Sequence, residues 1–111
     1  MSVYGTYTPS ETNLCFAIRM MNGSTINLGN RTTAMPVFLS YDSANPRTMT
    51  FESGATVSLD FGSRKLANGE KVISWSAIPA GVKFAEASRK WGLFLESDGI
   101  YVQRGLVLVF K

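Results

Sequence analysis

The chain has 111 residues, of which 45% are hydrophobic, so it is long enough for one folded domain and too apolar to be disordered. It has a net charge of +3, no histidine and a single cysteine, Cys15, which excludes an internal disulfide bond. The basic residues are dispersed, which argues against nucleic acid as a partner, and no apolar run reaches the ~18 residues of a membrane span. We expect one β domain over residues 1–111, with no metal and no cofactor.

Residues 1–13 are mostly polar, and Tyr4, Tyr7 and Pro9 are among their stiff or apolar members. This segment is predicted to be either a docking arm or a first strand. It lacks the basic segment followed by an apolar segment that is typical of export. Together with the unpaired cysteine, this predicts synthesis in the cytoplasm, and a virion assembled inside a cell would fit the same pattern.

Alternation of apolar and polar residues predicts strands in the first half of the chain. Leu14–Met21 alternates and is followed by Asn22-Gly23, the strongest short signal for a hairpin, with Ser24–Leu28 as the returning strand. Met35–Tyr41 is predicted to be another strand, which Pro36 places at an edge or at its beginning.

Two further hairpins are predicted in the middle of the chain. Thr48–Phe51 and Thr56–Phe61 flank a Glu-Ser-Gly turn, and Asn68-Gly69 lies before the apolar run Lys71–Ile78. Only Val82–Lys90 has a helix-forming composition, and it is shorter than the ~12 residues at which a helix is stable by itself.

The last part of the chain has the highest β propensity. Trp91–Glu96 and Ile100–Gln103 flank Ser97-Asp98-Gly99, which predicts a hairpin, and Leu106–Phe110 is apolar throughout, as in a strand buried on both faces. Such a strand must be covered by the rest of the chain or by another chain. In total, eight or nine short strands, at most one short helix near 82–90 and no internal repeat predict an antiparallel β-sandwich or a small barrel.

The sequence does not contain a recognisable catalytic constellation. Glu96 and Asp98 are the only closely spaced carboxylates, and their position beside a hairpin turn explains them. Cys15 and the serines lack a histidine that would activate them, and no glycine-rich phosphate loop is present. We therefore predict that the protein is not an enzyme and has no catalytic residues.

The candidate binding residues are large aromatic side chains with one polar atom, together with one arginine: Tyr4, Tyr7, Trp75, Trp91, Tyr101 and Arg104. Such aromatic residues are enriched at interfaces and in ligand grooves. The tryptophans are better explained as core residues between two sheets. Tyr4 and Tyr7 fit a core and an interface equally well.

Three features are similar to those of small β-rich proteins encoded among the tail genes of bacteriophages and prophages. They are Tyr4-Gly5 near the start, the alternating predicted hairpins, and the run WGLFLESDGIYV of Trp91–Val102. The start departs from the Met-x-Tyr-Gly pattern by one additional residue. The resemblance implies a non-enzymatic subunit, associated with a virion or a tail, that acts by oligomerisation or by contact with a receptor or another tail protein.

These observations lead to two hypotheses for the function. The first is a structural or interaction module that self-associates or docks on a larger assembly, through residues 1–13 and a sheet edge. Its partners would be further copies of the chain or another protein. The alternative is a β-sandwich that binds a carbohydrate or a receptor through exposed aromatic residues such as Trp75, Trp91 and Tyr101.

Overall fold

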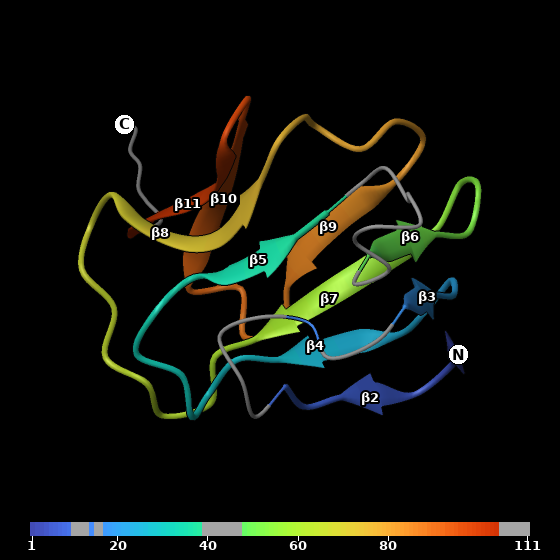
Figure 1. Cartoon of the computed structure of the whole chain (residues 1–111). Coiled ribbons are helices and arrows are strands. Elements are labelled where there is room, and N and C mark those ends of the chain that lie inside the picture. The colour runs from blue at the N-terminus through green and yellow to red at the C-terminus, as the bar shows by residue number, and fades with distance from the viewer. Residues whose placement is uncertain (10–13, 15–16, 39–47, 105–111) are drawn as a thin grey trace, which may run out of the picture.

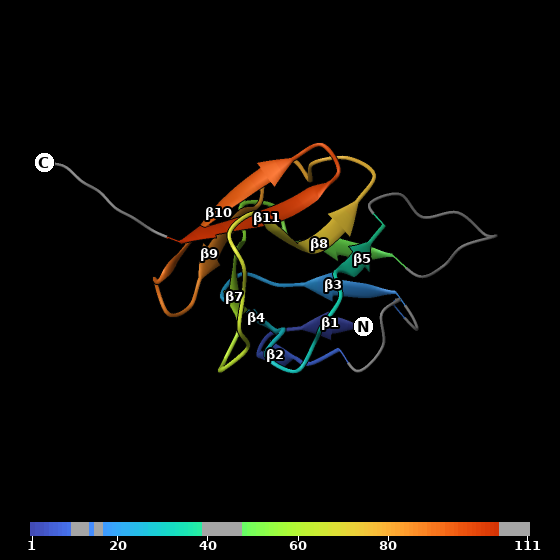
Figure 2. The same cartoon turned by 90° about the vertical axis from the view of Figure 1, so that its left-hand side faces the viewer.

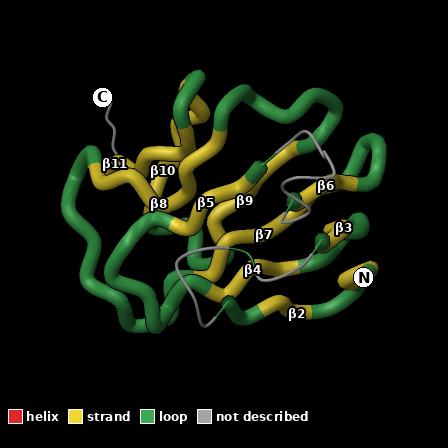
Figure 3. The backbone as a smooth tube through the Cα atoms, viewed as in Figure 1, coloured by secondary structure: helices red, strands yellow, loops and turns green. Residues whose placement is uncertain are grey.

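The computed structural model describes residues 1–9, 14, 17–38 and 48–104. Within these ranges all regular structure is β, as the sequence predicts (Figure 3). There are eleven strands: β1 Ser2–Val3, β2 Thr6–Tyr7, β3 Ile18–Met20, β4 Thr25–Asn27, β5 Met35–Val37, β6 Met49–Phe51, β7 Thr56–Asp60, β8 Glu70–Trp75, β9 Lys83–Glu86, β10 Trp91–Glu96 and β11 Gly99–Arg104. Their number exceeds the predicted eight or nine because many are only two or three residues long.

The chain winds as a coil, and the strands of its turns form three sheets. The first sheet has the order β1-β3-β6, the second β2-β4-β7-β9 and the third β10-β11-β8-β5. Three successive turns of the coil each contribute a strand to the first sheet and then one to the second, and each turn stacks on the one before it (Figures 1 and 2). The following turn adds β9 to the second sheet alone. Stacking of successive turns around one core is the arrangement of a parallel β-helix.

The pairing corrects the antiparallel sandwich expected from the sequence. Among the described strands, six of the eight pairings are parallel, and only β10 with β11 and β11 with β8 are antiparallel. The hairpin at Ser97-Asp98-Gly99 is confirmed, with Glu96 opposite Gly99. The strands on either side of the three other predicted hairpins do not pair with each other.

The turn at Asn22-Gly23 shows why the hairpin signal was misleading. Gly23 has the positive φ of 84° that the signal implies, but the turn is a corner that carries the chain from the first sheet to the second. Asn22 is bonded to the next turn of the coil, since its amide donates to Glu52 Oε1 and its side-chain oxygen accepts from the amide of Thr56. A tight turn needs positive φ in both settings, so the dipeptide predicts the turn and leaves the pairing open.

The structure also reveals an internal repeat that contradicts the expectation of none. The segment TINLGNR, residues 25–31, lies directly under SLDFGSR, residues 58–64, with Asn27 in register with Asp60. Each of these side chains accepts a hydrogen bond of 2.9 Å from the amide of a glycine two residues later, Gly29 or Gly62. The same residue types therefore build the same corner in two successive turns.

The arginine that ends each repeat connects its turn to the preceding one. Arg31 donates a hydrogen bond to the carbonyl of Pro9, and Arg64 donates one to the carbonyl of Leu28; each has a length of 3.4 Å. Arg64 also forms an ion pair with Glu70. Both arginines are largely buried, so each guanidinium stabilises the stacking of one turn on the next.

The core lies inside the coil and consists of aliphatic and sulfur-containing side chains. Fully buried examples are Met20, Ile26, Leu59, Ile73 and Ile100, which come from all three sheets. Phe84 of β9 packs on this core from above, against Phe51 and Trp75. The segment 82–90, the only helix candidate, is a strand followed by a turn, because β9 continues the second sheet beside β7.

The two ends of the coil differ. The hairpin of β10 and β11 lies at one end, and β1 and β2 lie at the other (Figure 2). Residues 1–9, predicted as an arm or a first strand, contribute these two strands. The predicted strand Leu106–Phe110 is outside the described residues. Within the part of the chain that the structure places, no helix has the length and hydropathy needed to cross a membrane.

Candidate functional site

The structure separates the six candidate residues into different environments. Tyr4 is 72% exposed in the turn between β1 and β2, and Tyr7 of β2 is half-buried against the core. Trp75 is buried, Trp91 and Tyr101 are half-buried, and Arg104 is exposed. Of the six, only Trp91 and Arg104 are brought into direct contact.

Trp75 is a core residue. Its side chain is 6% exposed and lies against Phe84, with 5.9 Å between ring centroids. The indole N–H donates to the carbonyl of Glu96 over 2.8 Å, which connects β8 to the end of β10. Its polar atom is therefore satisfied inside the protein, and Trp75 is not available for a ligand.

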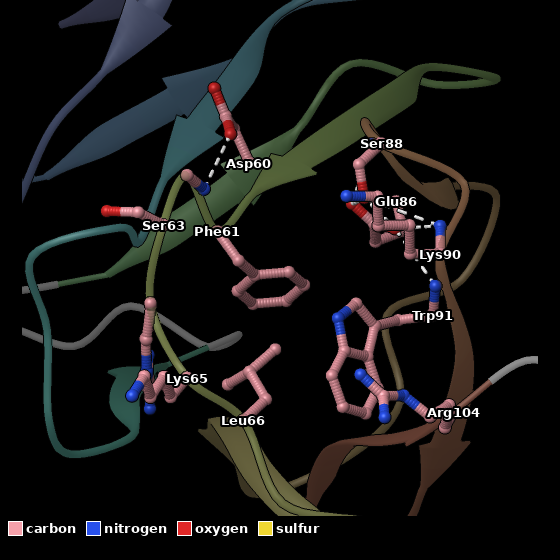
Figure 4. Close-up of a pocket in the computed structure, with 12 residues that line it drawn as sticks. Asp60, Phe61, Ser63, Lys65, Leu66, Glu86, Ser88, Lys90, Trp91 and Arg104 are labelled. Carbon is pink, nitrogen blue, oxygen red and sulfur yellow. Dashed lines mark hydrogen bonds between the residues drawn. The ribbon is translucent and has the colours of Figure 1, made fainter.

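Trp91 and Arg104 form one wall of a cleft near the hairpin end of the coil (Figure 4). They are directly opposite each other because Trp91 begins β10 and Arg104 ends β11, and the guanidinium lies 5.5 Å from the centroid of the indole ring. Phe61 and Leu66, from the segment after β7, face them across the cleft. The cleft volume of about 550 Å³ is within the range of small-ligand sites.

Glu86 organises the turn at the edge of this cleft. Its carboxylate accepts hydrogen bonds from the amides of Ser88, Lys90 and Trp91 and from the hydroxyl of Ser88. Burial alone would raise the pKa of Glu86, but these hydrogen bonds to the ionised form outweigh it and hold the pKa below its ordinary value. The carboxylate thereby fixes the backbone that leads into Trp91.

Some of the charged side chains around the cleft have hydrogen-bond or ion-pair partners among the described residues and others do not. Both oxygens of Glu86 are occupied by the turn, and Asp60 accepts from the amide of Gly62 through one oxygen. In the described ranges the ion pairs join Arg64 to Glu70 and Lys71 to Asp98, and neither pair includes Lys90 or Arg104. The cleft is lined by two carboxylates, Asp60 and Glu86, and by four basic side chains, Arg64, Lys65, Lys90 and Arg104. Even with Arg64 paired to Glu70, the basic side chains outnumber the carboxylates, so the lining has a net positive charge.

Tyr101 belongs to a separate cluster on the outer face of the hairpin. Its hydroxyl donates to Asp98 Oδ2 over 2.7 Å, and Lys71 Nζ lies 3.2 Å from the same oxygen. The hydrogen bond from Tyr101 and the contact with Lys71 lower the pKa of Asp98, and the same interactions with Asp98 raise the pKa of Tyr101 and of Lys71. Phe94, directly opposite Tyr101 in the hairpin, is 48% exposed.

The sequence analysis selected Trp91 and Arg104 as separate candidates and missed the contact between them. A signal was available, because a hairpin centred on Ser97-Asp98 places position 91 opposite position 104. Phe61 and Glu86 were also missed as cleft residues. The sequence analysis assigned Phe61 to the predicted strand Thr56–Phe61 and Glu86 to the helix candidate Val82–Lys90.

Comparisons with known proteins give no relative for this chain. No family model, no curated protein and no solved structure matches it. Its fold and its cleft therefore define it by class alone: an all-β chain of mostly parallel, coiled strands with an antiparallel hairpin at one end. Within the described ranges, no three or more Cys, Asp or Glu side chains are grouped so that they could hold a metal ion.

The different burial of the two tryptophans gives a direct test of the cleft. We expect the emission of a Trp91→Phe variant, which retains Trp75, to be blue-shifted and poorly quenched by acrylamide. A Trp75→Phe variant, which retains the half-exposed Trp91, should be quenched several-fold more strongly. Equal quenching of the two folded variants would contradict this placement of the side chains.

Proposed function

We propose that the protein is a non-enzymatic interaction module that self-associates by strand addition at the open edge formed by β1 and β2. One observation carries this proposal. Among the described residues, no strand pairs with the outer side of β1 or of β2, although these two strands are the edges of adjacent sheets. Unpaired edges are templates for the strands of another chain.

The backbone groups of alternate residues at this edge are oriented outward. The carbonyls of Met1, Val3 and Gly5 accept hydrogen bonds from the next turn of the coil. Alternate residues of a strand point their backbone groups to opposite sides, so those of Ser2 and Thr6 face away from the coil. A second copy can pair with these groups around a two-fold axis, since both copies then present the same surface.

The composition of the edge supports the same conclusion. Natural edge strands are commonly protected by charged side chains, especially lysine. Residues 1–9 have no charged side chain, and the exposed Tyr4 lies in the turn between the two strands. Each strand is only two residues long, so β1 and β2 would have to act together, with Tyr4 supplying aromatic contact area.

A single substitution tests the edge without breaking the coil. Thr6→Pro removes an outward amide that is not needed for pairing with β4, and proline is tolerated at such edge positions. We expect the parent chain to form dimers or larger species at micromolar concentrations in sedimentation experiments, and Thr6→Pro to associate at least about tenfold more weakly, which corresponds to ~1.4 kcal/mol. Thr6→Ala retains the amide and should behave as the parent chain.

Two results would contradict this proposal. One is a parent chain that stays monomeric at every concentration. The other is a Thr6→Pro variant that keeps its circular-dichroism spectrum and associates as strongly as Thr6→Ala.

The larger setting that we propose is a virion or a tail assembly, on the strength of the resemblance to small phage-tail proteins. A β module that adds strands at one end and has a hairpin at the other would suit a subunit that is joined to its neighbours on one side. Carbohydrate binding is a second candidate function. It no longer includes Trp75, which is buried, and is supported by the cleft beside Trp91 and Arg104.

A further inference from the structure

The cleft has apolar side chains on both of its walls, and they come from two distant parts of the chain. Phe61, Leu66 and Trp91 face one another across the cleft (Figure 4). Leu66 and Trp91 are only partly buried, so both retain surface for a ligand. Flat apolar surfaces of this kind pack well against the C–H face of a sugar ring, and they leave the ring hydroxyls free to reach the polar rim.

The cleft also has a hydrogen-bond donor without a partner. The indole N–H of Trp91 makes no hydrogen bond to any described residue, whereas that of Trp75 is bonded to Glu96. Figure 4 shows the indole nitrogen of Trp91 turned across the cleft toward Phe61. A hydroxyl group on a ligand packed against these rings would be within reach of this donor.

The rim adds positive charge at two places around Trp91. Arg104 lies over the indole ring, and Lys90 lies on the side of Glu86 (Figure 4). The ammonium of Lys90 has no ion-pair partner among the described residues, since Glu86 is occupied by backbone amides and Ser88. Charge-assisted hydrogen bonds to a carboxylate are stronger than neutral ones, so this rim favours an anionic ligand over a neutral one.

We propose that this cleft binds an acidic saccharide, a sugar ring that bears a carboxylate. The ring packs between Leu66 and Trp91, with the buried Phe61 behind them, and the indole N–H donates to a ring hydroxyl. Lys90 binds the carboxylate, and Arg104 adds positive charge on the other side of the indole. None of these residues belongs to β1 or β2, so the site does not depend on the proposed self-association. It extends the function from assembly to recognition of an acidic glycan.

The two tryptophans make the binding measurable in one titration. Trigalacturonic acid is the probe, and a neutral galactose trisaccharide is the comparison. In ¹⁵N-resolved NMR spectra we expect trigalacturonic acid to shift the indole resonance of Trp91 and to leave that of the buried Trp75 in place. Binding should weaken as salt is added, because part of it is charge recognition. The neutral trisaccharide should bind at least about tenfold more weakly, consistent with the loss of a charge-assisted contact.

Two variants separate recognition from folding. Lys90→Gln removes the charge of an exposed side chain, and we expect about three- to tenfold weaker binding of trigalacturonic acid. Lys83→Gln, on β9 and outside the cleft, is the matched control and should bind as the parent chain. Trp91→Ala should lose the binding by more than tenfold, with circular dichroism as the check on its fold.

Several results would overturn the proposal. They are the absence of binding at millimolar probe, equal affinity for the neutral trisaccharide, a shift of the Trp75 resonance alone, and equal effects of Lys90→Gln and Lys83→Gln. A monomeric parent chain would contradict the proposed assembly and leave this site intact. The two proposals therefore fail separately.

Discussion

Replacing Gly99 by alanine is expected to destabilise the protein more than any other glycine-to-alanine substitution in the hairpin of β10 and β11. Gly99 begins β11 beside β8, and a Cβ atom at this position would overlap the carbonyl oxygen of Ile73 and press on the backbone of Ser74. Backbone in the middle of a sheet cannot move aside cheaply, so we expect a loss of roughly 3 kcal/mol in the free energy of unfolding.

Gly92→Ala is the matched control for this substitution. Gly92 lies in the same hairpin, and a Cβ atom there would make ordinary contact with the ring of Phe94 at 3.6 Å. Its effect should stay within about 0.5 kcal/mol in urea unfolding experiments. If Gly99→Ala unfolded at the same urea concentration as Gly92→Ala, the close approach of β11 to β8 would be wrong.

Replacing Glu86 by alanine should have the second largest effect. The substitution removes the acceptor of three backbone amides and of the Ser88 hydroxyl at once. These donors are near the surface and can regain water, so we expect a loss of about 2 kcal/mol in unfolding free energy, less than for fully buried donors. The substitution should also disturb the cleft, because the turn that Glu86 holds positions Trp91.

The same carboxylate makes the stability depend on pH. Its pKa is lower in the folded chain than its ordinary value of 4.5, so the stabilisation is present above that value and is lost as the pH falls through the folded pKa. We expect Glu86→Gln to lose less stability than the parent chain between about pH 5 and pH 3. The pKa of Asp98 is also lowered, so its protonation should still cost the Glu86→Gln variant some stability as the pH falls. Unfolding free energies measured over this range that fall in parallel for both proteins would contradict the role given to Glu86.

The sequence predicted the positions of the strands better than their partners. Alternating residues located β4, β7 and the hairpin of β10 and β11, because a period of two reports which side chains face the core. The same period does not report which strand lies alongside. Asn22-Gly23 was read as a hairpin for this reason, although its hydrogen bonds run to the following turn of the coil.

The coil itself left a signal in the sequence that was missed. The segments TINLGNR and SLDFGSR, residues 25–31 and 58–64, share their polar and glycine positions while few residues are identical. Their likeness is one of chemistry, since Asn27 and Asp60 accept the same hydrogen bond at the same corner. A search for matched residue types would have indicated stacked turns, whereas a search for identical residues does not.

The candidate site was predictable only in part. Trp91 and Arg104 were both selected from the sequence, and the register of their hairpin was enough to pair them. Phe61 and Leu66 reach the cleft only because β7 lies beside β9, which leads into β10. That juxtaposition depends on the parallel pairing, so local sequence patterns contain no information about it.

The central claim is that the outer edge of β1 and β2 is where a second copy pairs, and amide hydrogen exchange at two protein concentrations tests it most directly. The amides of Ser2 and Thr6 should exchange fast in dilute protein and slow down in concentrated protein. Those of Met21 and Thr25, which donate to the carbonyls of Val3 and Gly5 within the coil, should be protected equally in both. Exchange at Ser2 and Thr6 that stays fast at every concentration would contradict the account.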